Sequence, residues 1–197
     1  MRSVTIAIED QLSEVLLSRV IAEFSPQLVV GLSIGRKGNG HLRNRLPNLV
    51  SAAQAGMPVI MLTDSDGPEA PDVVRSQWMK GLTYESSRFH LAVAVQEVEA
   101  WLLADELAVA HMLGKKCRAI PVPTDTIESP KEWLLTQALK SARRIKEQLV
   151  REEHGRLKIG EGYNALAARA VSEVWSPARA RANSFSLDQF MREMLTW

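Results

Sequence analysis

The chain has 197 residues, of which 46% are hydrophobic and 24% charged, a composition that suits one folded domain with an appendage and excludes disorder over most of its length. Twenty-four Lys and Arg residues oppose 23 Asp and Glu residues, and the net charge of +1 excludes a global field that draws the protein to nucleic acid or to a membrane. The single cysteine, Cys117, excludes an intramolecular disulfide framework and is typical of a reducing compartment. No apolar run approaches the roughly 18 residues of a membrane span, so we expect a cytoplasmic protein with no membrane partner.

The first part of the chain alternates short apolar runs with amphipathic segments of helix length. The expected strands are residues 4–8, 27–32, 57–63 and 89–95. The expected helices are residues 12–24, 42–55, 72–80 and 96–105. Strands that alternate with helices predict an α/β fold, with a mainly parallel four-stranded sheet flanked by helices.

The remainder of the chain reads as helical. Residues 130–153 form a long charged pattern with regularly spaced apolar side chains, which predicts one continuous helix. A polar loop is expected at 158–164, followed by helices near 165–175 and 186–194. We therefore predict an α/β domain over residues 1–114 and, over residues 115–197, a helical C-terminal extension that packs on the same domain.

Acidic residues follow three of the four expected strands. Glu9 comes after the first strand, Asp64 and Asp66 after the third, and Glu97 and Glu99 after the fourth. In open parallel sheets, ligands bind beyond the carboxyl ends of the strands, so these acids are expected at one edge. Clustered carboxylates repel one another unless a cation compensates, and hard oxygen ligands suit Mg²⁺ or Mn²⁺. A divalent ion held there can polarise a phosphate and activate water.

Simpler structural roles compete with this interpretation for several of the acids. Asp10 is placed to cap the following helix, and Asp105 is expected as a helix-surface acid. The Asp-Ser-Asp-Gly turn at residues 64–67 resembles the opening of a calcium loop, but the later ligands of such a loop are missing. Trp101 and Trp133 lie on apolar helix stripes and are expected in the core rather than against a nucleobase.

The order of these acids resembles the TOPRIM domain of topoisomerases, primases and the overcoming-lysogenization-defect nucleases. The resemblance is closer to an uncharacterised TOPRIM-like bacterial family, some of whose members accompany ATPases in defence loci. Six motifs spread over nearly the whole chain carry it. They are Ala-Ile-Glu-Asp near the start, Leu-Thr-Asp-Ser-Asp, Glu-Val-Glu-Ala-Trp-Leu-Leu-Ala-Asp (97–105), Ser-Pro-Lys-Glu (129–132), Gly-Tyr-Asn (162–164) and Ser-Phe-Ser-Leu (184–187).

The resemblance implies roles for individual acids. Glu9 matches the TOPRIM glutamate that acts as general base or metal ligand, and Asp64 and Asp66 match the metal-binding pair. Glu99 matches the later acid. Glu97 is the alternative, since residues two apart on a helix diverge by about 200°, but the Glu-Ala-Trp-Leu-Leu match favours Glu99. The implied catalytic set is Glu9, Asp64 and Asp66, and the implied metal set adds Glu99.

Basic residues at the same edge are candidates for phosphate binding. The glycine-rich loop over residues 33–40 carries Arg36 and Lys37, and His41 follows it. The loop lacks the spacing of a P-loop. Lys131, at the start of an expected helix, is a second phosphate contact, with a plain first-turn charge as its alternative.

The sequence thus predicts a magnesium- or manganese-dependent TOPRIM-type nuclease that cuts DNA or RNA, with the resemblance implying an ATPase partner. Two alternatives remain open. A receiver-like signalling module also binds magnesium with acids after its strands, although Gln96 and Glu97 stand here where a receiver needs Thr or Ser. A TOPRIM scaffold without chemistry is the other, and a homo-oligomer is compatible with each.

Overall fold

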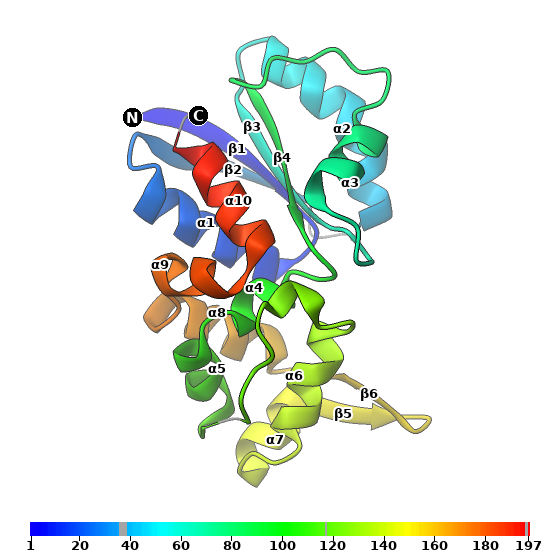
Figure 1. The fold of residues 1–197 in the computed structure, drawn as a ribbon, viewed down its shortest axis with the longest axis vertical. Coiled ribbons are helices and arrows are strands. Elements are labelled where there is room, and N and C mark those ends of the chain that lie inside the picture. The colour runs from blue at the N-terminus through cyan, green and yellow to red at the C-terminus, as the bar shows by residue number, and fades with distance from the viewer. Residues whose placement is uncertain (36–38, 117, 196) are drawn as a thin grey trace.

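The structure, a computed structural model, describes residues 1–35, 39–116, 118–195 and 197, the side chains of 39–41 excepted (Figure 1). One parallel sheet has the strand order β2-β1-β3-β4. The strands are β1 (Arg2–Ile8), β2 (Leu28–Gly35), β3 (Val59–Asp64) and β4 (Phe89–Ala94). The predicted α/β class, with four parallel strands flanked by helices, is confirmed. The second strand runs three residues further than expected, through residues 33–35 of the expected glycine-rich loop.

Helices cover both faces of the sheet and form the rest of the molecule (Figure 1). Those of the first part are α1 (Gln11–Phe24), α2 (Asn39–Gln54), α3 (Pro71–Trp78), α4 (Glu99–Leu103) and α5 (Glu106–Leu113). Those of the second are α6 (Pro130–Ala138), α7 (Arg143–Leu149), α8 (Tyr163–Glu173), α9 (Pro177–Ala180) and α10 (Phe185–Met194). Two short 3₁₀ turns, η1 (Thr124–Thr126) and η2 (Arg181–Asn183), complete the helical elements of the described chain.

Alternate residues of the strands supply two separate cores, as the two-residue period of a strand requires. One face of the sheet packs on α2 and α3 through a cluster that includes Ala7, Met61 and Val93. The other face contributes Ile6 and Leu62 to a larger cluster shared with α1, α4, α5, α6, α8 and α10. Because this larger core joins the sheet to the C-terminal helices, those helices are part of the same packed body.

Tryptophan and phenylalanine side chains join the sheet-side helices to the end of the chain. Trp101 of α4 is fully buried, as predicted, and stacks on Phe190 of α10 with ring centroids 5.6 Å apart. Its indole N–H donates to Ser186 Oγ at 2.8 Å. Trp133 is partly buried against the same cluster. Large aromatic surfaces removed from water in this way make the junction between the two parts of the chain a hydrophobic one.

The prediction of one long helix over residues 130–153 is wrong. The chain forms α6, turns, forms α7 and then enters a two-stranded antiparallel hairpin, β5 (Val150–Glu153) and β6 (Arg156–Ile159). The residues between the strands, His154 and Gly155, have φ of 50° and 74°. Positive φ at both central residues is the requirement of the two-residue type I′ hairpin turn. The polar loop predicted from residue 158 is correspondingly shorter.

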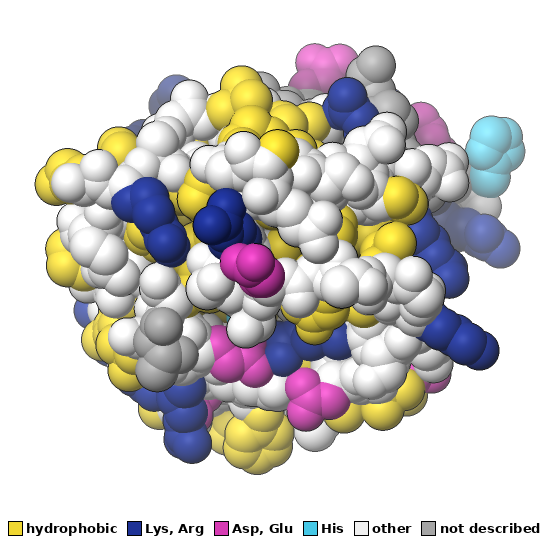
Figure 2. Space-filling model, turned by 90° about the horizontal axis from the view of Figure 1, so that it is seen from above, with side chains coloured by type: hydrophobic (Ala, Val, Ile, Leu, Met, Phe, Trp, Pro, Cys, Tyr) yellow, Lys and Arg dark blue, Asp and Glu magenta, His cyan; other side chains and the backbone are white. Residues whose placement is uncertain are grey.

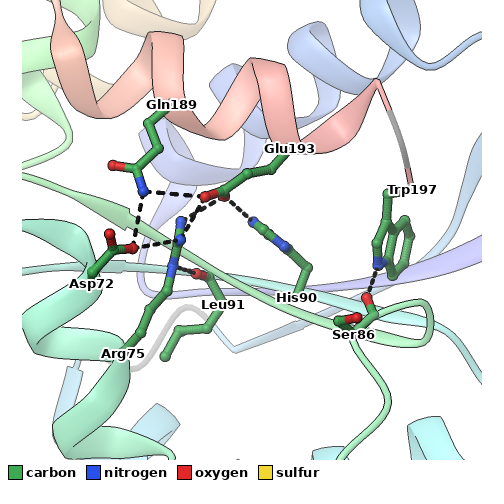
Figure 3. A network of polar contacts seen from close by, with 8 residues as sticks. All are labelled: Asp72, Arg75, Ser86, His90, Leu91, Gln189, Glu193 and Trp197. Carbon is green, nitrogen blue, oxygen red and sulfur yellow. Dashed lines mark hydrogen bonds and ion pairs between the residues drawn. The ribbon is translucent and has the colours of Figure 1, made fainter.

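Helix α10 is fastened to the sheet by a polar network (Figure 3). Arg75 of α3 binds both carboxylate oxygens of Glu193 at 2.7 Å and donates through Nε to the Leu91 carbonyl of β4 at 2.7 Å. His90 Nε2 lies 3.1 Å from the same carboxylate, and Gln189 bridges it to Asp72. A bidentate Arg–carboxylate pair of this kind fixes orientation as well as adding energy.

The two ends of the chain meet beside this network, at the edge of the sheet where the strands begin (Figure 1). Arg2 donates to the Trp197 carbonyl at 3.1 Å, and its guanidinium lies 4.9 Å from the centre of the indole ring. Seen from above, this end of the molecule carries Lys and Arg side chains spread among hydrophobic and acidic ones rather than gathered in one patch (Figure 2). Within the described residues, no helix has the length and apolar character needed to cross a membrane.

Candidate active site at the carboxyl ends of the strands

In the order β2-β1-β3-β4, β2 is added on one side of β1, whereas β3 and β4 are added on the other. The point at which the chain changes sides lies between β1 and β3, at the centre of the sheet. Glu9 directly follows β1, and Asp64 is the last residue of β3. Such a change of sides opens a crevice beyond the strand ends, and ligands bind there in open α/β sheets. The first two predicted acids therefore stand at the position that the topology itself marks.

Hydrogen bonds join these two acids into one unit. Glu9 Oε1 accepts from the hydroxyl of Thr63, the penultimate residue of β3, and from the backbone N–H of Asp64 at 3.1 Å. Asp64 Oδ1 accepts in turn from the backbone N–H of Val98 at 2.8 Å. The end of β1, the end of β3 and the segment after β4 are thus linked through two carboxylates.

The Asp64-Ser65-Asp66 turn is tied to the segment that follows β4. Ser65 N donates to the Ala94 carbonyl at 2.9 Å, and Asp66 N donates to the Gln96 carbonyl at 3.1 Å. Asp66 has a φ of 54°, in the left-handed region that aspartate tolerates better than most residues. The turn therefore holds Asp66 at the same edge as Glu9 and Asp64.

Glu97 and Glu99 have different surroundings. Glu97 Oε2 accepts from the backbone N–H of Lys131 at 2.9 Å, in the first turn of α6. Glu99 is 1% exposed, and its Oε1 accepts from the Tyr163 hydroxyl at 3.0 Å and lies 3.4 Å from Lys131 Nζ. The other oxygen, Glu99 Oε2, is buried and has no hydrogen-bond partner among the described residues. Glu97 is thus engaged by a helix terminus, whereas Glu99 keeps a buried oxygen free.

Burial and mutual repulsion raise the pKa values of the clustered acids. Burial, followed by the charges of Glu9 and Glu99, raises the pKa of Asp64 well above its usual range. Burial raises the pKa of Glu9 more than its hydrogen bonds with Thr63 and Asp64 lower it. These carboxylates therefore lie close enough to disfavour one another's ionised forms, which is the electrostatic situation that a bound cation relieves.

Lys131 compensates part of this charge. Burial raises the pKa of Glu99 to about 7 even though the Lys131 ammonium opposes the rise. Burial alone lowers the pKa of Lys131, but Glu99 and Glu97 outweigh it and raise the pKa above its usual value. Burial also raises the pKa of Tyr163 well above its ordinary value, so its hydroxyl stays a donor to Glu99. One lysine thus faces several acids.

The carboxylates of the site have the chemistry of ligands for a divalent cation. In this structure, hydrogen bonds and ion pairs with neighbouring residues hold them in place. Glu9, Asp64 and Glu99 offer hard carboxylate oxygens, and Glu99 Oε2 is a buried oxygen that lacks a partner. In the described part of the chain, no three acid, histidine or cysteine side chains already converge in an arrangement that could hold a metal ion. Metal binding would therefore require side chains to turn from Thr63 or Lys131 toward a common centre.

Two cavities open beside these acids. One, of about 270 Å³, is lined by Asp64 and Asp66 together with Arg43 of α2 and Trp78 of α3. The other, of about 630 Å³, is lined by Glu99, Lys131 and Tyr163 and extends to the β5–β6 hairpin. Pockets in this range of volume accommodate small ligands or pieces of larger ones. The acids thus have access to space on both sides.

The predicted phosphate-binding residues have separate outcomes. Arg36 and Lys37 lie outside the described residues, as does the side chain of His41, so their role stays a prediction. Lys131 is at the site, where it contacts acids. Sequence reasoning gave no role to Tyr163, although the Gly-Tyr-Asn motif that contains it was part of the TOPRIM-like resemblance.

The prediction that Asp105 is a surface acid is wrong. Its side chain is 2% exposed and caps α5, where Oδ1 accepts from Leu107 N at 3.2 Å. It also binds Arg179 at 2.7 Å and Ser176 N at 2.8 Å, which explains its burial. Asp10 caps α1 as predicted, accepting from Ser13 N at 2.8 Å. Both acids thus have a structural role as helix caps.

Comparison with known proteins gives a family and no activity. A family model described as a domain of unknown function, DUF4276, matches residues 5–195 and so spans both the sheet and the C-terminal helices. No curated protein matches the chain, and no solved structure does.

Proposed function

Because the chain belongs to the DUF4276 family, whose description names no activity, we propose its function from the site: a metal-dependent phosphodiesterase of TOPRIM type that cleaves nucleic acid. The observation that carries the proposal is Glu99. Its carboxylate is 1% exposed, one oxygen is held by Tyr163 and Lys131, and the other is buried without a partner among the described residues. A buried acceptor left unpaired costs free energy, and a cation ligand role accounts for keeping it.

The surrounding acids support the same conclusion. Burial raises the pKa of Asp64, and the charges of Glu9 and Glu99 raise it further, so Asp64 is electrostatically coupled to both of these acids. Structural acids such as Asp10 and Asp105 are instead satisfied by helix termini or an arginine. Acids that repel one another and have no structural partner to neutralise them are typical of a site that binds a cation.

The roles follow from position. Asp64, Asp66 and Glu99 would hold Mg²⁺ or Mn²⁺, which when bound polarises a phosphate and lowers the pKa of water. Glu9, with its raised pKa, orients a water and accepts its proton. Lys131 moves from Glu99 toward the phosphate, and Arg36, Lys37 and His41 are further candidates for phosphate contacts.

The first test is metal binding and cleavage by wild type and Asp64→Asn. Calorimetry with Mg²⁺ and Mn²⁺ should show binding to the wild type that the variant loses, because the substitution removes a ligand charge. A parallel assay on pooled DNA and RNA should show metal-dependent cleavage by the wild type alone. Unfolding of Asp64→Asn should occur at the same or a higher temperature, since Asn still accepts from Val98 N and relieves the repulsion.

Glu128→Gln is the matched control, since Glu128 is an exposed acid that forms no hydrogen bond or ion pair with another described residue. It should bind metal and cleave as the wild type does. Cleavage retained by Asp64→Asn contradicts the site assignment. Absence of metal binding by the wild type would favour a scaffold, and stable labelling by a small phosphodonor would favour the receiver-like module.

We also propose an ATPase partner, because the TOPRIM-like family that the sequence resembles includes members that accompany ATPases in defence loci. Co-purification of the protein with an ATPase encoded in the same locus tests this partner.

A further inference from the structure

The β5–β6 hairpin forms one wall of the larger cavity beside Glu99. Arg156 and Lys158 of β6 line it from one side, while Glu99 and Lys131 line it from the other. Hydrogen bonds fix the base of the hairpin, since Gly160 N donates to the Leu149 carbonyl at 2.9 Å and Gly162 N donates to the Gln148 carbonyl at 3.0 Å. In Figure 1 the hairpin projects from the body of the molecule beyond α6 and α7. The hairpin is thus a projecting element next to the site, and hydrogen bonds fix its base.

Basic side chains are in excess on one face of this hairpin. The antiparallel register pairs Arg151 with Lys158 and Glu153 with Arg156, so these four side chains share a face. The one acid among them, Glu153, forms an ion pair with Arg151 at 3.3 Å. Arg156 and Lys158 are exposed and form no ion pair with another described residue. Two cations therefore stand uncompensated at the cavity.

Charge is segregated across the cavity. The body of the molecule contributes three acids, Asp10, Glu99 and Glu132, and one cation, Lys131, whereas the hairpin contributes the two cations Arg156 and Lys158. A ligand that contacts both sides needs one negative group to bind the basic hairpin. It needs a second negative group to bind a cation that the acids hold. A phosphate chain has that property, because successive phosphates can contact a metal site and a basic arm. A single small phosphate would leave one side unmatched.

We propose that the β5–β6 hairpin is a binding arm for a single-stranded nucleic-acid backbone, with Arg156 and Lys158 contacting phosphates next to the one at the acids. This rests on the proposed function for the location of the scissile phosphate. The cavity, of about 630 Å³, accommodates a nucleotide-sized piece and not the width of a duplex. Cations on a short, rooted hairpin add electrostatic affinity that does not depend on base sequence.

The test measures binding separately from cleavage. Fluorescein-labelled single-stranded DNA and RNA of mixed sequence are titrated with protein in EDTA, and again with Ca²⁺, and anisotropy gives Kd over a range of salt concentrations. On single strands, each phosphate contact contributes about 0.7 to the magnitude of the slope of log K against log salt. Arg156→Ala/Lys158→Ala removes two such contacts and should therefore reduce this magnitude by about 1.4. At 0.1 M salt this corresponds to roughly 25-fold weaker binding.

The matched control is Lys140→Ala/Lys146→Ala, which removes the same charge from two exposed positions that do not line the cavity, one in the turn between α6 and α7 and one in α7. It should leave Kd and slope unchanged, and circular dichroism checks that both variants are folded. Equal weakening by the two pairs overturns the proposal. So does an equally tight, hairpin-dependent complex with a labelled poly-glutamate peptide, which would assign the arm to an acidic protein surface.

The outcomes separate this inference from the proposed function. Hairpin-dependent binding by a protein that never cleaves supports the arm and contradicts the phosphodiesterase. Metal-dependent cleavage with unchanged binding by Arg156→Ala/Lys158→Ala supports the phosphodiesterase and overturns the arm. No binding of either nucleic acid by the wild type contradicts both.

Discussion

At the scale of single residues, Glu99 is the buried acid on which the proposed function rests. Its carboxylate is buried beside a tyrosine hydroxyl and a lysine, and its pKa is raised to about 7 mainly by that burial. A well-packed apolar residue would serve the fold at lower cost, because charged groups lose hydration on burial. In the proposed function, Tyr163 is therefore the residue that positions Glu99.

Tyr163→Phe tests this positioning. Removing the hydroxyl takes away the hydrogen bond to Glu99 Oε1 and should lower the free energy of unfolding by about 1–3 kcal/mol. Urea unfolding at neutral pH measures the loss, and calorimetry should show weakened Mg²⁺ binding by the same variant. Tyr84→Phe is the control, since Tyr84 is 42% exposed and lies away from the acids. A Tyr163→Phe protein with wild-type stability and metal affinity would contradict the role.

Residues at this scale divide into those that the sequence indicates and those that it does not. Glu9, Asp64 and Glu99 could be placed together because strand ends of a parallel sheet share an edge. The burial of Asp105 could not be foreseen, since its partner Arg179 lies 74 residues away in the sequence. Long-range ion pairs leave no local pattern. The contact of Tyr163 with Glu99 is equally non-local.

At the scale of elements, α10 is attached to the sheet through Glu193. Burial by itself raises the pKa of this carboxyl, but the contacts with His90 and Arg75 outweigh burial and lower it to about 2. The carboxylate is therefore more stable in the folded protein than in the unfolded chain. This contribution to stability is fully present above the ordinary glutamate pKa and is lost as the pH falls through about 2.

Glu193→Gln should remove that pH dependence. At neutral pH we expect the variant to lose about 1–3 kcal/mol of unfolding free energy, because Arg75 loses its charged partner. Between about pH 4.5 and pH 2 the wild type should lose stability more steeply than the variant, so that the two curves approach each other. Denaturant unfolding over that range measures both. Parallel curves would show that the pKa of Glu193 is not lowered.

The elements themselves were predictable where hydrophobic pattern exists. The strands of the sheet are apolar runs, mostly buried in β1, β3 and β4 and largely exposed in the edge strand β2, and their positions follow from the hydrophobic pattern along the sequence. The β5–β6 hairpin is different, because most of its side chains are exposed and charged and its turn is His154-Gly155 rather than Asn-Gly. Charged residues between 130 and 153 favour a helix locally, and tertiary packing of Leu149 and Val150 overrides that preference.

At the scale of the whole molecule, the sheet and the C-terminal helices share one core. The cluster that contains Ile6 and Trp101 also contains Tyr163 and Phe190, so residues 1–114 leave apolar surface exposed when they stand alone. Burial of such surface supplies most of the favourable free energy of folding. The match of the family model over residues 5–195 covers the same body.

A chain that ends at residue 114 should therefore fail to fold cooperatively. Circular dichroism should show a broad thermal transition or none, and the fragment should bind the hydrophobic dye ANS, whereas the full chain should unfold in one sharp step. Recovery of a sharp transition after adding residues 115–197 as a separate chain would support the shared core. A fragment that melts sharply by itself would contradict it and make the first part an independent domain.

The contact between Arg2 and Trp197 places both ends of the chain at the edge of the sheet opposite the acids (Figure 1). Anything joined to either end therefore leaves the molecule on the side away from Glu9 and Asp64. Adjacent ends are also the condition for circular permutation. A short linker between residues 197 and 1 would let new termini be opened at Gly81, an exposed position with φ of 80°, without disturbing the strand ends.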